Sequence, residues 1–182
     1  MNKNNNDSKK SPLGAGGKTL LLIRHAKSSW DDFSLSDFDR PLNERGKNDA
    51  PKMAKRLRKE GIKIDAFISS PAKRAKKTAE YFIKEFDQGK EDIIIISALY
   101  DAGLNDFSQT VKEINDKYDS AAIFSHNPGI TAFANQLINN PEIDNMPTCS
   151  VFAIKADTDK WKDFAKAKKE FLFFDYPKKE DQ

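Results

Sequence analysis

The sequence predicts an α/β fold: a three-layer sandwich in which a mostly parallel central sheet is flanked by helices. Short apolar runs, each long enough for one buried strand, alternate along the chain with amphipathic helical segments. No internal repeat and no Pro-, Gly- or Ser-rich linker divides the body of the chain. Near the C-terminus two extended segments follow each other, which predicts a hairpin and hence one antiparallel edge strand.

The first predicted strand covers residues 19–23, where apolar residues run from Leu20 to Ile23 without interruption. The helix that follows is expected to begin at an Asn43 N-cap and to end at Gly61. Its apolar residues recur at the three- and four-residue steps of one buried face. Pro51 falls inside this pattern, so it is expected to kink the helix or to mark where its regular part begins.

The second predicted strand covers residues 64–68, and the next helix is expected to begin with Ser70 as N-cap and Pro71 at the first helical position. A third strand is predicted over residues 93–96, which look too apolar for an exposed edge. The later elements are a helix near residues 107–118, a strand over 121–125, a helix over 130–138, and extended segments over 151–156 and 170–174.

Composition bounds the class of protein. The 182 residues suit one domain, here placed over residues 19–177, with a disordered tail over residues 1–18 and a short tail over 178–182. The net charge of +3 is too small to argue for nucleic acid binding, and the lysine-rich patches fit solvated helix faces. No stretch approaches the roughly 18 apolar residues of a membrane span, and the N-terminus has no secretory signal. The single Cys149 fits a reducing compartment, so we expect a cytoplasmic protein.

Both histidines of the chain stand at the ends of predicted strands. His25 follows the first strand, directly after Arg24, and His126 follows the strand over 121–125. Ligands of open α/β sheets bind outside the carboxyl ends of the strands, so both histidines are candidates for a binding or catalytic site. Taken alone, Arg24 and His25 could equally be surface residues without a function. Because His126 also stands directly after a strand, a functional site is the favoured interpretation.

Arg74 lies in the predicted first turn of the helix after the second strand, where free backbone N–H groups favour anions. The alternative is a solvated arginine among the neighbouring lysines. Together, two arginines and two histidines would form a pocket for a dianion such as a phosphoryl group, and one imidazole could attack phosphorus. Two histidines without a nearby carboxylate at ligand spacing make a poor metal site, and no nucleotide-binding loop is present, so no metal and no cofactor are expected.

Three segments resemble the signatures of the histidine phosphatase superfamily, whose fold is phosphoglycerate-mutase-like. They are Arg24-His25-Ala26, the segment from Ser69 to Ala79, and Ser125-His126-Asn127-Pro128-Gly129. Asp39-Arg40-Pro41-Leu42 and Gly46 extend the resemblance to the small SixA-like branch of phosphohistidine phosphatases. The resemblance covers residues 19–177, with Ala26 and Ser125 standing where many relatives have glycine.

The resemblance implies that His25 is the nucleophile, that Arg24, Arg74 and His126 hold the phosphoryl oxygens, and that Ser28 adds a hydroxyl. Larger relatives carry an acidic proton donor after the third strand. Asp101 is the nearest candidate for that donor here, although a turn residue before Gly103 explains it equally well. The acidic loop from Trp30 to Arg40 is either a flap over the site or a solvated loop.

The function expected from these residues is a metal-independent phosphatase that forms a phosphohistidine intermediate and dephosphorylates phosphohistidine on a protein partner. The alternative within the superfamily is a phosphomonoesterase for a small metabolite. A binding module without catalysis is disfavoured because both histidines are present, and we expect neither a nucleic acid nor a membrane partner. A monomer is favoured, while the sequence leaves the oligomeric state and the identity of the substrate open.

Overall fold

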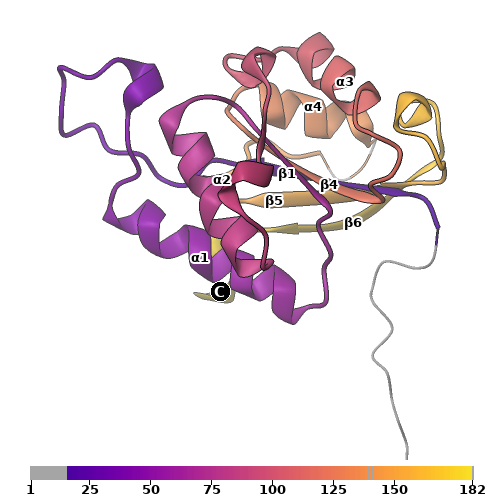
Figure 1. Cartoon of the computed structure of the whole chain (residues 1–182), viewed down its shortest axis with the longest axis horizontal. Coiled ribbons are helices and arrows are strands. Elements are labelled where there is room, and N and C mark those ends of the chain that lie inside the picture. Colours follow the sequence, from indigo (N-terminus) through magenta and orange to yellow (C-terminus); the bar gives the residue numbers. More distant parts are fainter. Residues whose placement is uncertain (1–15, 139, 141, 182) are drawn as a thin grey trace, which may run out of the picture.

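The computed structural model describes residues 16–138, 140 and 142–181. One six-stranded sheet lies between two pairs of helices, which confirms the predicted three-layer α/β architecture (Figure 1). The strands are β1 (Lys18–Arg24), β2 (Ala66–Ser69), β3 (Ile94–Ile95), β4 (Ser120–Ser125), β5 (Val151–Ala156) and β6 (Lys169–Asp175). The α-helices are α1 (Glu44–Lys59), α2 (Lys73–Glu85), α3 (Leu104–Lys112) and α4 (Gly129–Leu137). The 3₁₀ helices of the described residues are η1 (Asp37–Asp39), η2 (Lys90–Asp92), η3 (Ser97–Leu99), η4 (Trp161–Asp163) and η5 (Pro177–Asp181).

The strand order is β3-β2-β4-β1-β5-β6, which puts β1 and β4 at the centre of the sheet. The four strands from β3 to β1 are parallel, as the alternation of strands and helices requires. β5 runs antiparallel to both β1 and β6, so the predicted C-terminal hairpin is present and β6 forms the edge. The chain therefore combines a mostly parallel sheet with one strand of opposite direction.

The alternation of side chains along β1 divides the apolar core between the two faces of the sheet. Leu20 and Leu22 pack with the buried residues of α3 and α4, whereas Leu21 and Ile23 pack with those of α1 and α2. All four side chains are completely buried. A strand that is apolar at every position must be covered on both faces, which is why the uninterrupted run predicted a central strand.

Three expectations about individual elements are wrong. The helix expected near residues 107–118 begins at Leu104 and already ends at Lys112. β3 contains only Ile94 and Ile95, lies at the edge of the sheet, and leaves these side chains 39% and 41% exposed. An apolar run reports hydrophobicity, but the place of a strand in the sheet depends on how the chain crosses over. The helix α2 begins at Lys73, with Ala72 as its N-cap, rather than at Pro71; the Ser70 hydroxyl instead accepts a hydrogen bond from the Ala72 N–H in the preceding turn.

The start of α1 agrees with the prediction, because the Asn43 side chain accepts a hydrogen bond from the N–H of Gly46. α1 continues through Pro51 to Lys59. Of the expected N-terminal tail, residues 1–15 lie outside the described residues, and Lys18 is already the buried first residue of β1. Residues 178–181, expected in a C-terminal tail, belong to η5, which packs beside α1 (Figure 1). Among the described residues, no helix is both long enough and apolar enough to cross a membrane.

Candidate active site

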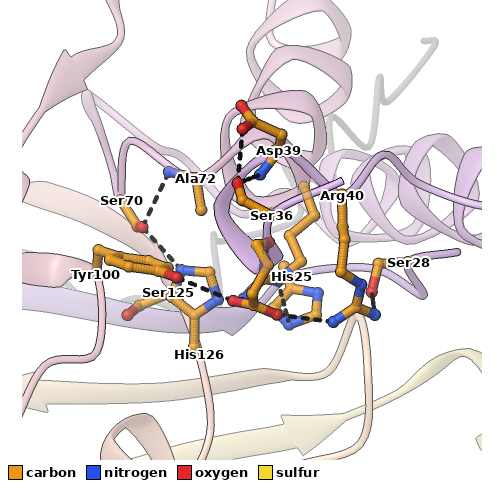
Figure 2. A network of polar contacts seen from close by, with 12 residues as sticks. His25, Ser28, Ser36, Asp39, Arg40, Ser70, Ala72, Tyr100, Ser125 and His126 are labelled. Atoms are coloured by element: carbon orange, nitrogen blue, oxygen red, sulfur yellow. Dashed lines mark hydrogen bonds and ion pairs between the residues drawn. The ribbon is translucent and has the colours of Figure 1, made fainter. Parts of the chain in front are cut away.

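The register of the two central strands brings both histidines together. Arg24 of β1 pairs with Ser125 of β4, and the backbone N–H of His25 donates to the Ser125 carbonyl oxygen at 3.0 Å. The next residue of each strand is therefore a histidine at the same carboxyl edge of the sheet. The two imidazole rings lie 5.1 Å apart between centroids, and both side chains are more than 90% buried (Figure 2).

The hydrogen bonds of His25 define its tautomer. Nδ1 lies 2.8 Å from the carbonyl oxygen of Ala26, which can only accept, so Nδ1 carries the proton. Nε2 therefore has a free lone pair, and the Nε–H of Arg74 donates to it at 3.3 Å. The lone pair of Nε2 thus faces the guanidinium group of Arg74, which the sequence predicted in the same pocket.

Among the described residues, two nitrogen atoms of the site are buried without a hydrogen-bond partner. His126 Nε2 lies 2.7 Å from the Ser70 hydroxyl, whose proton has no other acceptor among the described residues and is donated to the ring. The proton of His126 is then on Nδ1, which has no partner among the described residues. The same holds for Nε of Arg24, whose Nη1 donates to the Met146 carbonyl oxygen at 2.7 Å. Buried N–H groups are costly to leave unpaired, so both are suited to an anionic oxygen.

Thr78 connects the start of α2 to the segment after His25. Its hydroxyl donates to the Arg74 carbonyl oxygen at 2.7 Å and accepts from the Ala26 N–H at 3.0 Å. Residues four apart in a helix lie on one face, so the same turn that presents Arg74 also holds Ala26, the residue after His25. These contacts explain why arginine and threonine occur at this spacing.

A carboxylate from the loop before α1 reaches the same arginine. Oδ2 of Asp37 lies 2.8 Å from Nη2 of Arg74 and 3.0 Å from the Tyr100 hydroxyl, while Oδ1 lies 2.8 Å from Nη1 of Arg40. The Asp37 carbonyl oxygen also accepts from Arg74. Arg40 in turn donates to the Ser28 hydroxyl at 2.6 Å. Figure 2 shows Arg40 and Ser28 on the side of His25 opposite to His126 and Tyr100.

The model of the histidine phosphatase superfamily (branch 1) matches residues 20–130, more than half of the chain and all four central site residues. This chain belongs to the histidine phosphatase superfamily. An uncharacterized chloroplastic protein of Arabidopsis thaliana is 31% identical over 161 residues, which cover 84% of this chain and 73% of that protein. The 2,3-bisphosphoglycerate-dependent phosphoglycerate mutase of Bartonella tribocorum is 33% identical over 99 residues, and the match spans 53% of this chain but only 48% of the mutase.

Solved structures of this superfamily share the fold. The structure of SixA from Agrobacterium tumefaciens, a proposed phosphohistidine phosphatase, aligns with a TM-score of 0.75 and 23% identity over 88% of this chain and 99% of that chain. The structure of the protein histidine phosphatase SixA complexed with tungstate aligns with a TM-score of 0.74 and 19% identity, over 87% of this chain and 97% of that chain. The family model confirms the expected superfamily, and these structures confirm the resemblance to the SixA-like branch as a likeness of fold.

Burial and positive neighbours keep the two histidines of this phosphatase-family site neutral. Burial lowers the pKa of His25 to about 3, and the charges of Arg74 and Arg24 and the neighbouring His126 act in the same direction. Burial, Arg74 and Arg24 lower the pKa of His126 to about 4. Partial burial alone would raise the pKa of Asp37, but its hydrogen bonds to Arg74 and Arg40 lower it to about 2. At neutral pH the site therefore combines neutral imidazoles, an ionised carboxylate and guanidinium cations.

The structure brings together four of the six residues singled out in the sequence: Arg24, His25, Arg74 and His126. Ser28 is buried, but its hydroxyl is bound to Arg40. Asp101 is exposed and adopts a left-handed backbone with φ of 55°, a conformation that aspartate tolerates in turns. No hydrogen bond joins the Asp101 side chain to another part of the described chain, so its assignment as proton donor stays a prediction.

The sequence reasoning did not single out Asp37, Tyr100 or Arg40 as parts of the site. Asp37 lies in the acidic loop that was expected to be either a flap or a solvated loop, and its contacts with Arg74 favour the flap. The only sequence signal for this carboxylate was the position of that loop directly after the first strand. Within residues 16–138, 140 and 142–181, no three His, Cys, Asp or Glu side chains are close enough to share a metal ion.

Proposed function

We propose that this protein is a phosphatase that forms a phosphoryl intermediate on His25 without a metal ion and acts on phosphohistidine of a protein. The observation that carries the proposal is the orientation of His25: Nδ1 is bound to the Ala26 carbonyl oxygen, so the lone pair of Nε2 faces Arg74. A buried, neutral imidazole held in this tautomer is a nucleophile prepared for attack on phosphorus.

The chemistry has two displacement steps. In the first, Nε2 of His25 forms a bond to phosphorus, the bond between phosphorus and the substrate imidazole breaks, and that imidazole leaves with its electron pair and takes a proton. In the second, the oxygen of a water molecule forms a bond to phosphorus and the bond between phosphorus and Nε2 of His25 breaks. Its electron pair returns to the imidazole, and inorganic phosphate leaves as the water loses a proton to solvent. Arg24, Arg74 and the Nδ1–H of His126 are the donors that would bind the phosphoryl oxygens in both transition states.

The state of the nearest carboxylate supports a P–N rather than an alkyl P–O substrate. An alkoxide leaving group needs a proton from a well-placed acid, which contributes about 10²- to 10⁴-fold in rate. Asp37, which is bound to Arg74, has a pKa of about 2 and is therefore ionised at neutral pH. A substrate imidazole can be protonated as it leaves, so it does not depend on an acid of the enzyme.

Exposed aromatic side chains beside the site support a macromolecular substrate. Trp30 and Phe33 are 61% and 92% exposed, and Leu35 and Phe38 of the same loop are each 37% exposed. Exposed apolar side chains clustered on one loop are typical of protein-interaction surfaces. A fold neighbour is also named a protein histidine phosphatase and was solved with tungstate, a tetrahedral oxyanion like phosphate.

The test compares a phosphohistidine peptide, an aryl phosphate and a sugar phosphate as substrates, each with and without a chelator. We expect strong preference for the peptide, weak hydrolysis of the aryl ester, almost no hydrolysis of the sugar phosphate and no effect of the chelator. Efficient hydrolysis of the sugar phosphate that is lost in Asp101→Asn would favour the metabolite phosphatase instead. Loss of all activity with the chelator would refute the metal-independent mechanism.

A further inference from the structure

A second concave region lies outside the catalytic pocket. A cavity of about 730 Å³ is lined by α1, by Pro147 and Thr148, and by the segment Tyr176–Lys178 that follows β6. η5 packs beside α1 at this place (Figure 1). The rings of Pro147 and Tyr176 contribute apolar surface to the cavity, and the completely buried Met53 lies beneath it. We call this cavity the α1 groove.

The charged side chains that line the α1 groove are almost all cationic. The cations are Arg45, Lys52, Lys55, Arg56, Lys59 and Lys178. Among the described side chains of the lining, one is acidic, that of Asp49. The whole chain has a net charge of only +3, so the positive charge is concentrated here rather than spread evenly. A concave surface of one sign focuses the electrostatic field and attracts a partner of the opposite sign.

The arginines of the α1 groove are bound within the protein, but several lysines are not. Arg56 forms a largely buried ion pair with Asp175 at 2.9 Å, and Arg45 contacts Asp49 at 3.5 Å and the Thr148 hydroxyl at 3.0 Å. Within the described part of the chain, Lys52, Lys55 and Lys59 have no acidic group within 4.0 Å. These three exposed lysines are thus available to an acidic partner.

The α1 groove and the active site share one segment of chain. Met146 accepts a hydrogen bond from Arg24, and the N–H of Cys149 donates to the carbonyl oxygens of Arg24 and His25. Pro147 and Thr148, which line the groove, lie between these two residues. The α1 groove therefore adjoins the segment that contacts Arg24 and His25.

We propose that the α1 groove binds an acidic segment of the protein whose phosphohistidine enters the active site, which deepens the function proposed above and rests on it. From Arg45 to Lys59 the cationic side of α1 is about 21 Å long at 1.5 Å per residue. This length matches about six residues of extended chain or about four turns of a docked helix. An elongated row of separate lysines on an apolar floor fits carboxylates spread along a polypeptide better than one compact anion.

The test uses two labelled eight-residue peptides without phosphohistidine, one rich in glutamate and one with glutamine in its place. Binding is measured by fluorescence polarisation to the full-length protein, to the variant Lys52→Gln/Lys55→Gln/Lys59→Gln, and to the control Lys112→Gln/Lys162→Gln/Lys166→Gln. The control removes three equally exposed lysines from the part of the chain around α3 and η4. Neither variant changes a residue of the active site.

We expect the acidic peptide to bind the unmodified protein and the control equally, and to bind the α1-groove variant roughly tenfold more weakly, the effect of about three exposed ion pairs. When the peptides carry phosphohistidine, the KM of the α1-groove variant should rise by the same factor. Its kcat and its rate of phosphoramidate hydrolysis should stay unchanged. Equal binding of both peptides, or an equal loss in the control, would overturn the proposal. Equally tight binding of an oligothymidylate would overturn it too, because it would indicate a general polyanion site. If binding depends on the three lysines but no phosphohistidine peptide is hydrolysed, the proposed phosphatase activity is refuted, whereas the proposed binding of an acidic segment at the α1 groove is not.

Discussion

Replacing Asp37 by asparagine removes the carboxylate that shares Arg74 with the proposed phosphoryl group. In the structure this carboxylate is bound to Arg74, Arg40 and Tyr100, so an incoming dianion has to compete with it for the Arg74 guanidinium. The Asp37 side chain is 47% exposed, so its attraction to Arg74 is comparable to that of a favourable exposed ion pair, about 1 kcal/mol. Removing this competition should tighten the binding of phosphate or tungstate about fivefold.

The assay is the inhibition constant of inorganic phosphate against aryl phosphate hydrolysis, together with calorimetric titration of tungstate. Because the pKa of Asp37 is about 2, the carboxylate is ionised throughout pH 5–8 and the fivefold gain should be constant over that range. Asp39→Asn is the matched control, since Asp39 lies in the same loop and its side chain contacts Ser36. Unchanged or weaker anion binding in Asp37→Asn would refute the competition, as would an equal gain in the control.

Three further predictions follow from particular contacts. Arg74→Ala should lower kcat/KM roughly 10²-fold or more because it removes a positioned transition-state donor, whereas the exposed Lys73→Ala should change it far less; equal losses would show that Arg74 has been assigned wrongly. In the folded protein the pKa is about 3 for His25 and about 4 for His126, whereas histidine in an unfolded chain has a pKa of roughly 6.5. The unfolded chain therefore binds more protons than the folded one, so the free energy of unfolding must fall as the pH drops below about 6.5. Denaturant unfolding in phosphate-free buffer should show a loss of roughly 2 kcal/mol per histidine at pH 5, and the variant His25→Gln/His126→Gln should lack it; equal pH slopes would contradict the pKa argument. Gly46→Ala should lower the thermal midpoint and activity together, because a Cβ there would meet the Lys27 carbonyl oxygen, and an unchanged midpoint would contradict this close packing.

The sequence was most informative where periodicity and position coincide. The uninterrupted run from Leu20 to Ile23 predicted a central strand, and the positions of His25 and His126 directly after strands predicted that they would meet. Both follow from general rules, because parallel neighbours place their carboxyl ends at one edge of the sheet. Arg74 was found by its place in the first turn of a helix at the same edge.

Sequence reasoning failed where the outcome depends on tertiary neighbours. The edge position of β3 could not be read from four isoleucines, since the order of strands is set by the crossovers. Asp37 lies in a loop without periodicity, and only the fold brings its carboxylate to Arg74. The Ser70 contact with His126 was hidden because the same serine looked like the N-cap of a helix.

Trapping the phosphorylated enzyme tests the central claim most directly. Unmodified protein and His25→Ala would be mixed with phosphoramidate, quenched in alkali within milliseconds to seconds, and examined by mass spectrometry without exposure to acid. We predict one phosphoryl group on the His25 imidazole of the unmodified protein, and neither label nor turnover in a folded His25→Ala. A phosphoryl group on another residue, or turnover retained by His25→Ala, would contradict the mechanism.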